Sequence, residues 1–314
     1  MTAAIGFDDV RAAAARIAGI VHRTPVLTSN SLDARLGCRV FFKCENLQKV
    51  GAFKARGALN AVRALSDVDA VRGVITHSSG NHGAAVAWAA RQRGIPCVVV
   101  MPRTAPQVKI DAVKGYGAEV VLCEVKDRDA TSARVARERD LRMIHPFEDP
   151  QVIAGQGTAA LELLEEVRTL DAIVAPVGGG GLLSGTAIAS AAASPRTRVI
   201  GAEPAAADDA ARSLHSGVHQ ARVDDPQTAC DGLLTRLGAP NFAILREHRV
   251  EVLTASEGAI LAAARFFLER MKIVVEPSGA VPLAVIEEHR ARFASTRVGL
   301  ILSGGNTDFS WLAR

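Results

Sequence analysis

The 314-residue chain is poor in aromatic residues and has no cluster of basic ones. Aromatic side chains make up 4% of the residues and apolar side chains 48%, so we expect a core built from Ala, Val, Leu and Ile. The formal net charge of +4 is small for this length, and Lys and Arg form no stripe. A nucleic-acid partner is therefore not expected, because binding to a phosphate backbone requires a concentrated basic surface.

The five cysteines show neither the CxxC spacing of redox motifs nor the spacing of metal ligands. No secretory signal is visible at the N-terminus, since Asp8, Asp9 and Arg11 come before any apolar run. Together these features predict buried free thiols in a reducing, cytoplasmic location. The cysteines are Cys38, Cys44, Cys97, Cys123 and Cys230.

The longest uncharged stretch, residues 172–195, differs from a membrane span. It holds five glycines and two prolines, and its first residues have the composition of a strand. A spanning helix needs about 20 consecutive, predominantly apolar residues in helical conformation. No membrane attachment is therefore expected.

Short apolar runs alternate with helical segments along the chain. The runs show no polar alternation, which indicates parallel strands covered on both faces. Strand, turn and helix in this order indicate βαβ units in an open sheet, and therefore an α/β fold. An Ala-rich helix ending at Arg93 and a helix over residues 182–193 follow two of the strands. The expected strands are residues 73–77, 96–101, 118–122, 172–177, 198–203 and 298–302.

Four polar segments interrupt this pattern. Residues 51–58 read GAFKARGA, 78–83 read SSGNHG, 178–181 are four glycines, and 303–306 read SGGN. Together they offer the amine of Lys54, a nest of backbone N–H groups, an Asn and a Ser hydroxyl. These are the groups needed to hold pyridoxal phosphate (PLP) as a Schiff base.

With these motifs in this order, the chain resembles the PLP-dependent serine/threonine dehydratases and serine racemases, from about Thr24 to Asp308. The resemblance implies the tryptophan synthase β-like fold (fold type II): two open, mostly parallel twisted sheets flanked by helices, with the cofactor between a large and a small domain. It implies a discontinuous large domain at residues 1–68 and 149–314, with a small domain at 69–148. A homodimer and a small amino-acid substrate are also implied.

The glycines Gly178, Gly179, Gly180 and Gly181 follow an expected strand and precede an expected helix. Glycines let the backbone wrap closely around an anion, which also meets the positive end of the helix dipole. Phosphate binding is therefore the favoured interpretation. A dinucleotide site and a purely structural turn are the alternatives. The GxGxxG spacing is absent, although Glu203 lies about where a ribose-binding acid would.

In the enzymes that the chain resembles, the lysine at the position of Lys54 bears the cofactor, and the Phe at Phe53 packs near its ring. The amine must be deprotonated to form an imine, and burial lowers the pKa of a lysine. Ser303 ends an expected strand, where its hydroxyl can hydrogen-bond the pyridine nitrogen without forcing its protonation. Asn81 resembles the residue that bonds the ring 3-hydroxyl. The alternatives are a solvated lysine and ordinary turn chemistry at Ser303 and Asn81.

Residues 78–83 open a helix, and the free N–H groups of a helix start favour a carboxylate. By resemblance, this turn, with Ser78, Ser79, Asn81 and His82, holds the substrate. Ser79 is also a catalytic candidate. Serine racemases have a serine there, which faces the ring opposite the lysine as the second acid/base, while many threonine dehydratases have alanine. His82 is either a functional imidazole or a histidine packed beneath the ring.

Glu203, the carbonyl of Ala207 and Asp209 can supply three oxygens to a hard cation whose other positions are water. In the metal-dependent racemases and dehydratases the matching positions bind magnesium or calcium, so Mg²⁺, or else Ca²⁺ or Mn²⁺, is expected. The alternative is that Asp208 or Asp209 serves only as the N-cap of a following helix. Both roles can coexist if Asp208 is the cap.

Two positions depart from the family pattern. The serine racemases have two serines where Thr235 and Arg236 stand, and one of those serines contacts the substrate. Arg236 either meets a second substrate carboxylate, which 3-hydroxyaspartate would provide, or points to solvent.

The expected activity is a PLP-dependent ammonia-lyase that converts L-serine or L-threonine to a 2-oxo acid and ammonium, with racemisation through Ser79 as a further expectation. A threo-3-hydroxyaspartate ammonia-lyase is the alternative. Two hypotheses come from other classes: a non-catalytic PLP carrier and a nicotinamide oxidoreductase. Lys54, Ser79 and the metal triad argue against a carrier, because storage needs only the lysine and the phosphate loop.

Overall fold

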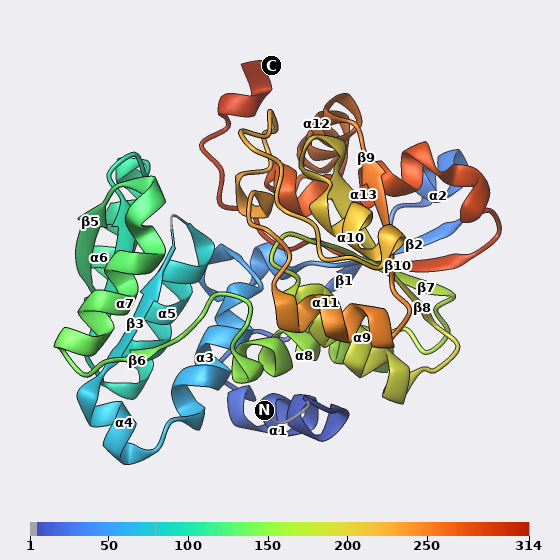
Figure 1. The fold of residues 1–314 in the computed structure, drawn as a ribbon. Coiled ribbons are helices and arrows are strands. Elements are labelled where there is room, and N and C mark those ends of the chain that lie inside the picture. The colour runs from blue at the N-terminus through green and yellow to red at the C-terminus, as the bar shows by residue number, and fades with distance from the viewer. Residues whose placement is uncertain (1–4, 79, 314) are drawn as a thin grey trace.

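The computed structural model describes residues 5–78 and 80–313, which form two sheets lying side by side (Figure 1). The larger sheet has the strand order β1-β2-β10-β7-β8-β9 and the smaller one β5-β4-β3-β6. The pairs are parallel except for the antiparallel pair β1–β2. The predicted α/β fold, with two mostly parallel sheets flanked by helices, is confirmed.

The strands expected from the sequence agree with the observed ones to within about one residue. They correspond to β3 (Val74–His77), β4 (Cys97–Pro102), β5 (Glu119–Cys123), β7 (Ala172–Pro176), β8 (Arg198–Pro204) and β10 (Arg297–Ile301). Four further strands were not expected from the sequence: β1 (Val26–Leu27), β2 (Arg39–Lys43), β6 (Arg142–Met143) and β9 (Glu251–Ala255).

Side chains alternate between the two faces of each sheet, and both faces are covered. In β7, Ala172 and Val174 join one core cluster, while Ile173 and Ala175 join the cluster on the opposite face. This alternation is the two-residue period of a strand, and it explains why the runs show no regular alternation of polar and apolar residues.

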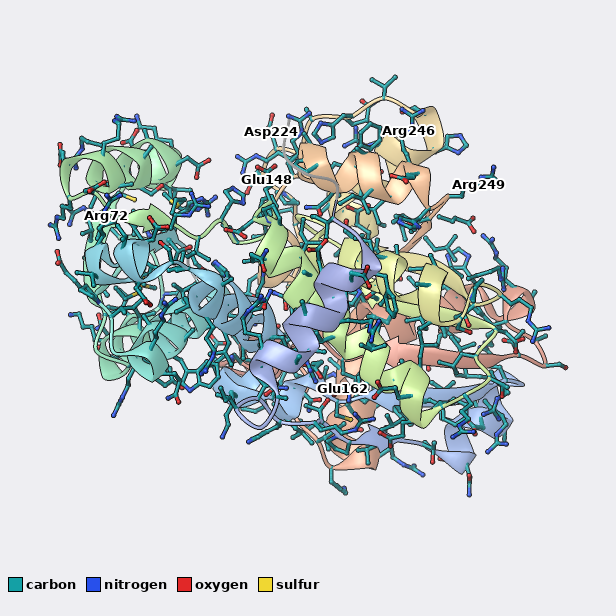
Figure 2. The ribbon with its side chains drawn as sticks, turned by 90° about the horizontal axis from the view of Figure 1, so that it is seen from below. Arg72, Glu148, Glu162, Asp224, Arg246 and Arg249 are labelled. Carbon is teal, nitrogen blue, oxygen red and sulfur yellow. The ribbon has the colours of Figure 1, made fainter. Side chains whose placement is uncertain are left out.

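Helices cover the faces of the larger sheet. One face packs against α1 (Phe7–Ile17), α8 (Pro150–Glu166), α9 (Gly181–Ala193), α10 (Asp209–Ser216) and α11 (Ala239–Glu247). The other packs against α2 (Asn30–Leu36), α12 (Glu257–Phe266) and α13 (Pro277–Glu288). Seen from below, α1 lies across α8 (Figure 2).

The smaller sheet is also covered on both faces. On one side lie α3 (Lys54–Ala64), α5 (Asn81–Arg93) and α6 (Gln107–Gly115), and on the other α7 (Arg128–Glu138). A further helix, α4 (Asp67–Arg72), precedes β3. The strands of this sheet fall between residues 74 and 143, inside the expected small domain, while the domain boundaries themselves stay a prediction. Across residues 5–78 and 80–313, no helix has both the length and the apolar character needed to cross a membrane.

Candidate active site

A cleft opens at the carboxyl ends of β3, β7 and β10, where ligands of open α/β sheets bind. Four polar segments that are distant in the sequence meet there. The predicted residues lining the cleft are Phe53, Lys54, Ser78, Asn81, His82, Gly178, Gly179, Gly180, Gly181 and Ser303. Ser79 lies outside the described residues.

Backbone pairing sets Lys54 beside Ser303. The Phe53 N–H donates to the Ser303 carbonyl at 2.9 Å, and Ala52 forms an isolated antiparallel bridge with Gly304. Lys54 is the first residue of α3, so its side chain leaves this bridge directly into the cleft. The lysine and the serine therefore face one cavity although they come from opposite ends of the chain.

The environment of the Lys54 amine favours its neutral form. Nζ donates to the Pro146 carbonyl at 2.8 Å and lies 5.2 Å from the centre of the Phe53 ring. Burial lowers the pKa of Lys54 from 10.5 to about 8, because a buried ammonium loses its hydration. An amine with this pKa is partly deprotonated near neutral pH, as imine formation requires.

The glycine loop is shaped by close contacts that admit no side chain. A Cβ on Gly179 would lie 2.2 Å from the Phe147 ring, and Gly180 has φ +92°, a left-handed conformation. Asn241 Nδ2 fixes the loop by donating to the carbonyls of Gly179 at 2.7 Å and Phe147 at 2.8 Å. Asn241 is fully buried, and the sequence analysis did not identify it.

The loop keeps its backbone donors unused. Among the described residues, no backbone carbonyl accepts from the N–H groups of Gly178, Gly179 or Gly180. The loop also leads into the N-terminus of α9, where the first N–H groups of a helix have no partner within it. Such a nest at a helix start fits a phosphate group.

Ser303 and Asn81 lie beside a buried carboxyl group that the sequence analysis missed. Asn81 Nδ2 donates to Glu276 at 3.0 Å, and Asn81 Oδ1 accepts from Asn306 Nδ2 at 2.9 Å. Burial, followed by the nearby Asp231 charge, raises the pKa of Glu276 to about 7. The network thus orients the Asn81 amide beside Gly304, which follows the almost fully buried Ser303.

The start of α5 forms the opposite wall of the cleft. The Gly80 N–H donates to Ser78 Oγ at 3.1 Å, and α5 begins at Asn81. His82 is buried, with Nε2 lying 3.3 Å from the Ile144 carbonyl. Burial and the nearby Lys54 amine hold the pKa of His82 well below 6.5, so the imidazole is neutral. This agrees with a packed histidine at the helix start.

Cationic side chains line the rim of the cleft on the side of the smaller sheet. Lys109 of α6 forms an ion pair with Asp231, which belongs to the larger-sheet part of the chain. Arg128 begins α7, and among the described residues its only polar partner is the exposed Asp129, at 3.4 Å. Both Lys109 and Arg128 line the cleft.

Arg236 lies outside the cleft lining. Its Nε donates to the Gln220 carbonyl at 2.8 Å and its Nη2 lies 3.1 Å from His219 Nδ1. The guanidinium is exposed, as the second of the two alternatives for Arg236 predicted. Thr235, the other departure from the family pattern, does line the cleft.

Glu203, Ala207 and Asp209 are all almost fully buried, at 1%, 3% and 3% exposure. Burial, followed by the nearby charge of Asp209, raises the pKa of Glu203 to about 9. Two buried carboxyl groups so close together are costly unless protonated or neutralised by a cation. The donor set therefore fits a hard divalent cation. Among the described residues, no cluster of three or more His, Cys, Asp or Glu offers another metal site.

The alternative in which the side chain of Asp208 caps the following helix is wrong. Asp208 precedes α10 but makes no side-chain cap, and bonds Arg212 instead. The cap comes from Glu203 at the end of β8, whose carboxylate oxygens accept from Ala210 N at 3.0 Å and Ala211 N at 2.8 Å. A carboxylate oxygen has two lone pairs, so this cap leaves acceptor capacity for a cation.

Comparison with known proteins decides the family. The family model described as "Pyridoxal-phosphate dependent enzyme" matches residues 17–304. The chain belongs to the pyridoxal-phosphate-dependent enzymes. The predicted cofactor is therefore PLP, and among the alternatives for the glycine loop a dinucleotide does not fit this family.

Several relatives of this PLP-dependent enzyme match along almost their whole length. The β-hydroxyaspartate dehydratase of Paracoccus denitrificans is 49% identical over 308 residues, 98% of each chain. The crystal structure of serine racemase from Dictyostelium discoideum has a TM-score of 0.93 at 46% identity, covering 98% of this chain and 100% of that one. The crystal structure of a threonine deaminase from T.th. has a TM-score of 0.92 at 49% identity, covering 97% and 99%. The enzyme thus belongs among PLP-dependent lyases and racemases.

The pKa of Lys54 predicts how the cofactor-free protein captures PLP. The rate of covalent attachment should rise with pH with a midpoint near 8 instead of 10.5, because only the neutral amine attacks the aldehyde. Borohydride reduction followed by peptide mass spectrometry measures the attachment at each pH. Lys54→Ala should give no adduct in the cleft, and an unchanged adduct in that variant would show that another amine is used.

Proposed function

We propose that the protein is an ammonia-lyase for β-hydroxy amino acids, with 3-hydroxyaspartate as its preferred substrate. The observation that carries the preference is Arg128, a cleft-lining guanidinium whose only described polar partner is an exposed neighbour. Bound PLP would supply an electron sink for the carbanion formed at the substrate Cα. Lys54 would hold the cofactor, residues 178–181 its phosphate and Ser303 its ring nitrogen.

The remaining chemistry belongs to side chains and helix ends of the chain. The N-terminus of α5 would bind the substrate α-carboxylate through its free N–H groups. Lys54 Nζ would take the Cα proton, for which its lowered pKa suits it. The β-hydroxyl then leaves as water with the equivalent of the proton taken from Cα, and the released enamine tautomerises to an imine that water hydrolyses to a 2-oxo acid and ammonium.

Arg128 supports a dicarboxylic substrate. Once the start of α5 binds one carboxylate, the cleft still contains the Arg128 cation, while Lys109 is already paired with Asp231. A guanidinium binds a carboxylate through two parallel hydrogen bonds. The side chains of serine and threonine have no carboxylate for such a contact. The similarity to a relative named β-hydroxyaspartate dehydratase supports the same choice. A structure titled threonine deaminase is equally similar, at 49% identity, so the preference for 3-hydroxyaspartate over serine and threonine rests on Arg128.

Glu203, Ala207 and Asp209 would bind Mg²⁺ or a similar hard cation. The cation would neutralise two neighbouring buried carboxylates and tie the end of β8 to the start of α10. Because it binds the folded protein alone, it would also stabilise the fold by mass action.

Racemisation is a second activity that the relatives favour, since one solved relative is named a serine racemase. Inversion requires a proton on the face opposite Lys54, and Ser79 is the residue that the sequence offers for this task. A protein that captured PLP but released neither a 2-oxo acid nor a D-isomer from any of these substrates would instead be a cofactor carrier.

Substrate preference is tested by steady-state release of 2-oxo acid from threo-3-hydroxyaspartate, serine and threonine. Arg128→Met should lower kcat/KM for 3-hydroxyaspartate about 30-fold, equivalent to about 2 kcal/mol for a lost charge-assisted contact, and change serine turnover little. Arg134→Met is the matched control, because Arg134 lies on the same helix and is exposed, paired with Glu138 at 2.8 Å. An equal loss on both substrates, or a parent enzyme that prefers serine, would contradict the proposed role.

The metal is tested by thermal unfolding after EDTA treatment, with and without added Mg²⁺. Mg²⁺ at about 100 times its Kd should add about 2.7 kcal/mol of stability. The gain should increase between about pH 6.5 and pH 9, because the cation competes with the proton on Glu203. Glu203→Gln should remove the gain, whereas Asp208→Asn, which alters a half-buried ion pair nearby, should keep it. No response to Mg²⁺ in the parent protein would leave Glu203 as a helix cap only.

Ser79→Ala separates the two activities. The variant should lose interconversion of L- and D-serine but keep elimination from the L-substrate, because elimination uses only the Lys54 face. Chiral chromatography of the amino acid pool measures the first activity, and release of 2-oxo acid the second. Racemisation at the parent rate in the variant would rule out Ser79 as the second acid/base.

A further inference from the structure

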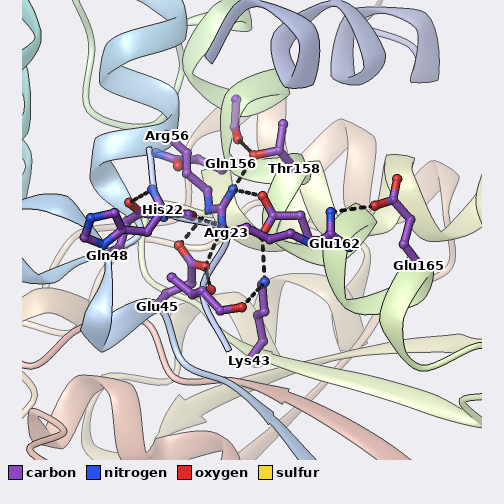
Figure 3. Close-up of polar contacts among 12 residues, drawn as sticks. His22, Arg23, Lys43, Glu45, Gln48, Arg56, Gln156, Thr158, Glu162 and Glu165 are labelled. Carbon is purple, nitrogen blue, oxygen red and sulfur yellow. Dashed lines mark hydrogen bonds and ion pairs between the residues drawn. The ribbon is translucent and has the colours of Figure 1, made fainter. Parts of the chain in front are cut away.

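Beneath the first turn of α3 lies a group of four buried charged side chains, which we call the junction cluster: Lys43, Glu45, Arg56 and Glu162 (Figure 3). Lys43, Glu45 and Arg56 have no exposed side-chain surface, and Glu162 is 16% exposed. None of the four lines the cleft, so the proposed chemistry does not use them directly.

Arg56 is the centre of the cluster. Its Nε and Nη2 donate to the two oxygens of Glu45 at 2.7 and 2.8 Å, and its Nη1 and Nη2 donate to those of Glu162 at 2.7 and 2.8 Å. Nη1 also reaches Thr158 Oγ1 at 3.2 Å. All five N–H groups of the guanidinium are therefore satisfied, and the planar group is clamped from two sides.

The charges of the cluster balance. Lys43 Nζ donates to Glu162 at 2.6 Å and to the Thr24 carbonyl at 2.7 Å, so two cations face two carboxylates. Burial alone would raise the pKa of Glu162, but its bonds to Arg56 and Lys43 hold it below the usual value. Two formal positive charges thus face two formal negative charges, so the cluster carries no net formal charge.

Five separate parts of the chain meet at this cluster. Thr24 precedes β1, Lys43 ends β2, Glu45 begins the short helix η1 (Glu45–Leu47), Arg56 lies in α3, and Glu162 in α8. A buried ion pair contributes little net stability compared with well-packed apolar side chains, and its best-attested use is to specify one arrangement over others. The arrangement specified here is that of α3 against α8 and β2.

The helical period connects this arrangement to the active site. Lys54 and Arg56 are two residues apart, about 200° around the helix axis, so they leave α3 on opposite sides. A clamp on Arg56 therefore fixes the rotation of the first turn, and with it the direction of Lys54. Helices α3 and α8 also touch through Gly57, which follows Arg56, and Gly155. A Cβ on Gly155 would lie 2.6 Å from Gly57 Cα.

We propose that the junction cluster is the device that positions Lys54, with Arg56 as the positioning residue that sets the rotation of α3. The inference rests on the proposed role of Lys54 as the attachment site of PLP. If the Lys54 amine is displaced by about 1 Å, it loses much of its reactivity toward an aldehyde bound in the cleft. Such a displacement does not require the protein to unfold.

Arg56→Lys tests the inference, because it keeps the charge and removes the two-sided clamp. In the full chain, stripped of cofactor and offered PLP, the rate of covalent attachment should fall about tenfold, and its pH midpoint should rise as the amine moves toward solvent. Arg23→Gln is the local control, since it removes an exposed pair with Glu165 of α8 and should leave both quantities unchanged. Ile286→Ala, in the buried core of α13, is the control for a general loss of stability.

Glu162→Gln gives a second test that holds even if Arg56→Lys fails to fold. It leaves Arg56 paired with Glu45 but gives the cluster an excess positive charge, which by itself would lower the pKa of Lys54. Loss of positioning predicts the opposite: the pH midpoint of PLP attachment should rise. Adding Lys43→Met to Glu162→Gln should restore the charge balance and part of the attachment rate.

The outcomes separate the two levels of the proposal. If Arg56→Lys lowers the unfolding temperature as Ile286→Ala does, with the attachment rate and pH midpoint of the parent, the cluster is only structural. An unchanged or lowered midpoint in Glu162→Gln overturns the inference in the same way. If Lys54→Ala still attaches PLP at the parent rate, Lys54 is not the attachment site. The inference about the junction cluster is then also wrong, because it rests on that role.

Discussion

The hydrogen bond from the Phe53 N–H to the Ser303 carbonyl is the contact on which the site depends. It joins the segment after β2 to the segment after β10, two strands that are already neighbours in the larger sheet. Parallel pairing brings the ends of these strands to one edge, and the hydrogen bond then sets the distance between the lysine and the serine. Together with the bridge between Ala52 and Gly304, it fixes where α3 begins relative to the sheet.

The second constraint is that side chains lie very close to the backbone around the cleft. This explains why glycine is required at particular positions there. Gly179 lies against the ring of Phe147, and Gly304 leaves room for the Glu276 carboxylate, which would lie 2.5 Å from a Cβ at that position. Phe147 and Pro146 belong to the segment that returns from the smaller sheet to α8. One short stretch therefore contacts both the glycine loop and the Lys54 amine.

The sequence predicted those parts of the site that depend on local pattern. The glycine loop, the turn after β3 and Ser303 each follow an apolar run, so their place at the edge of a sheet could be inferred. Glu276 and Asn241 could not be found in this way, because their contacts are with residues distant in the sequence, such as Asn81 for Glu276. Arg128 starts a helix and follows no apolar run, so only the fold shows that it lines the cleft. The alternative cap of α10 by Asp208 was wrong because the Glu203 carboxyl group reaches the helix start from the preceding strand. The missed strands β1 and β6 have only two residues each, and the missed β9 pairs with one neighbour only, β8.

The glycine loop with Ser303, and the cationic side chains of the cleft, come from different parts of the fold. The glycine loop and Ser303 follow strands of the larger sheet, whereas Arg128 and Lys109 lie on helices of the smaller one. With Arg128 in its proposed role, substitutions in α6 or α7 would alter which substrate side chain is accepted without changing the glycine loop or Ser303. Such a separation would let the substrate range of one fold change while its cofactor-binding residues stay the same. A redesign of substrate range would therefore begin with the helices over the smaller sheet.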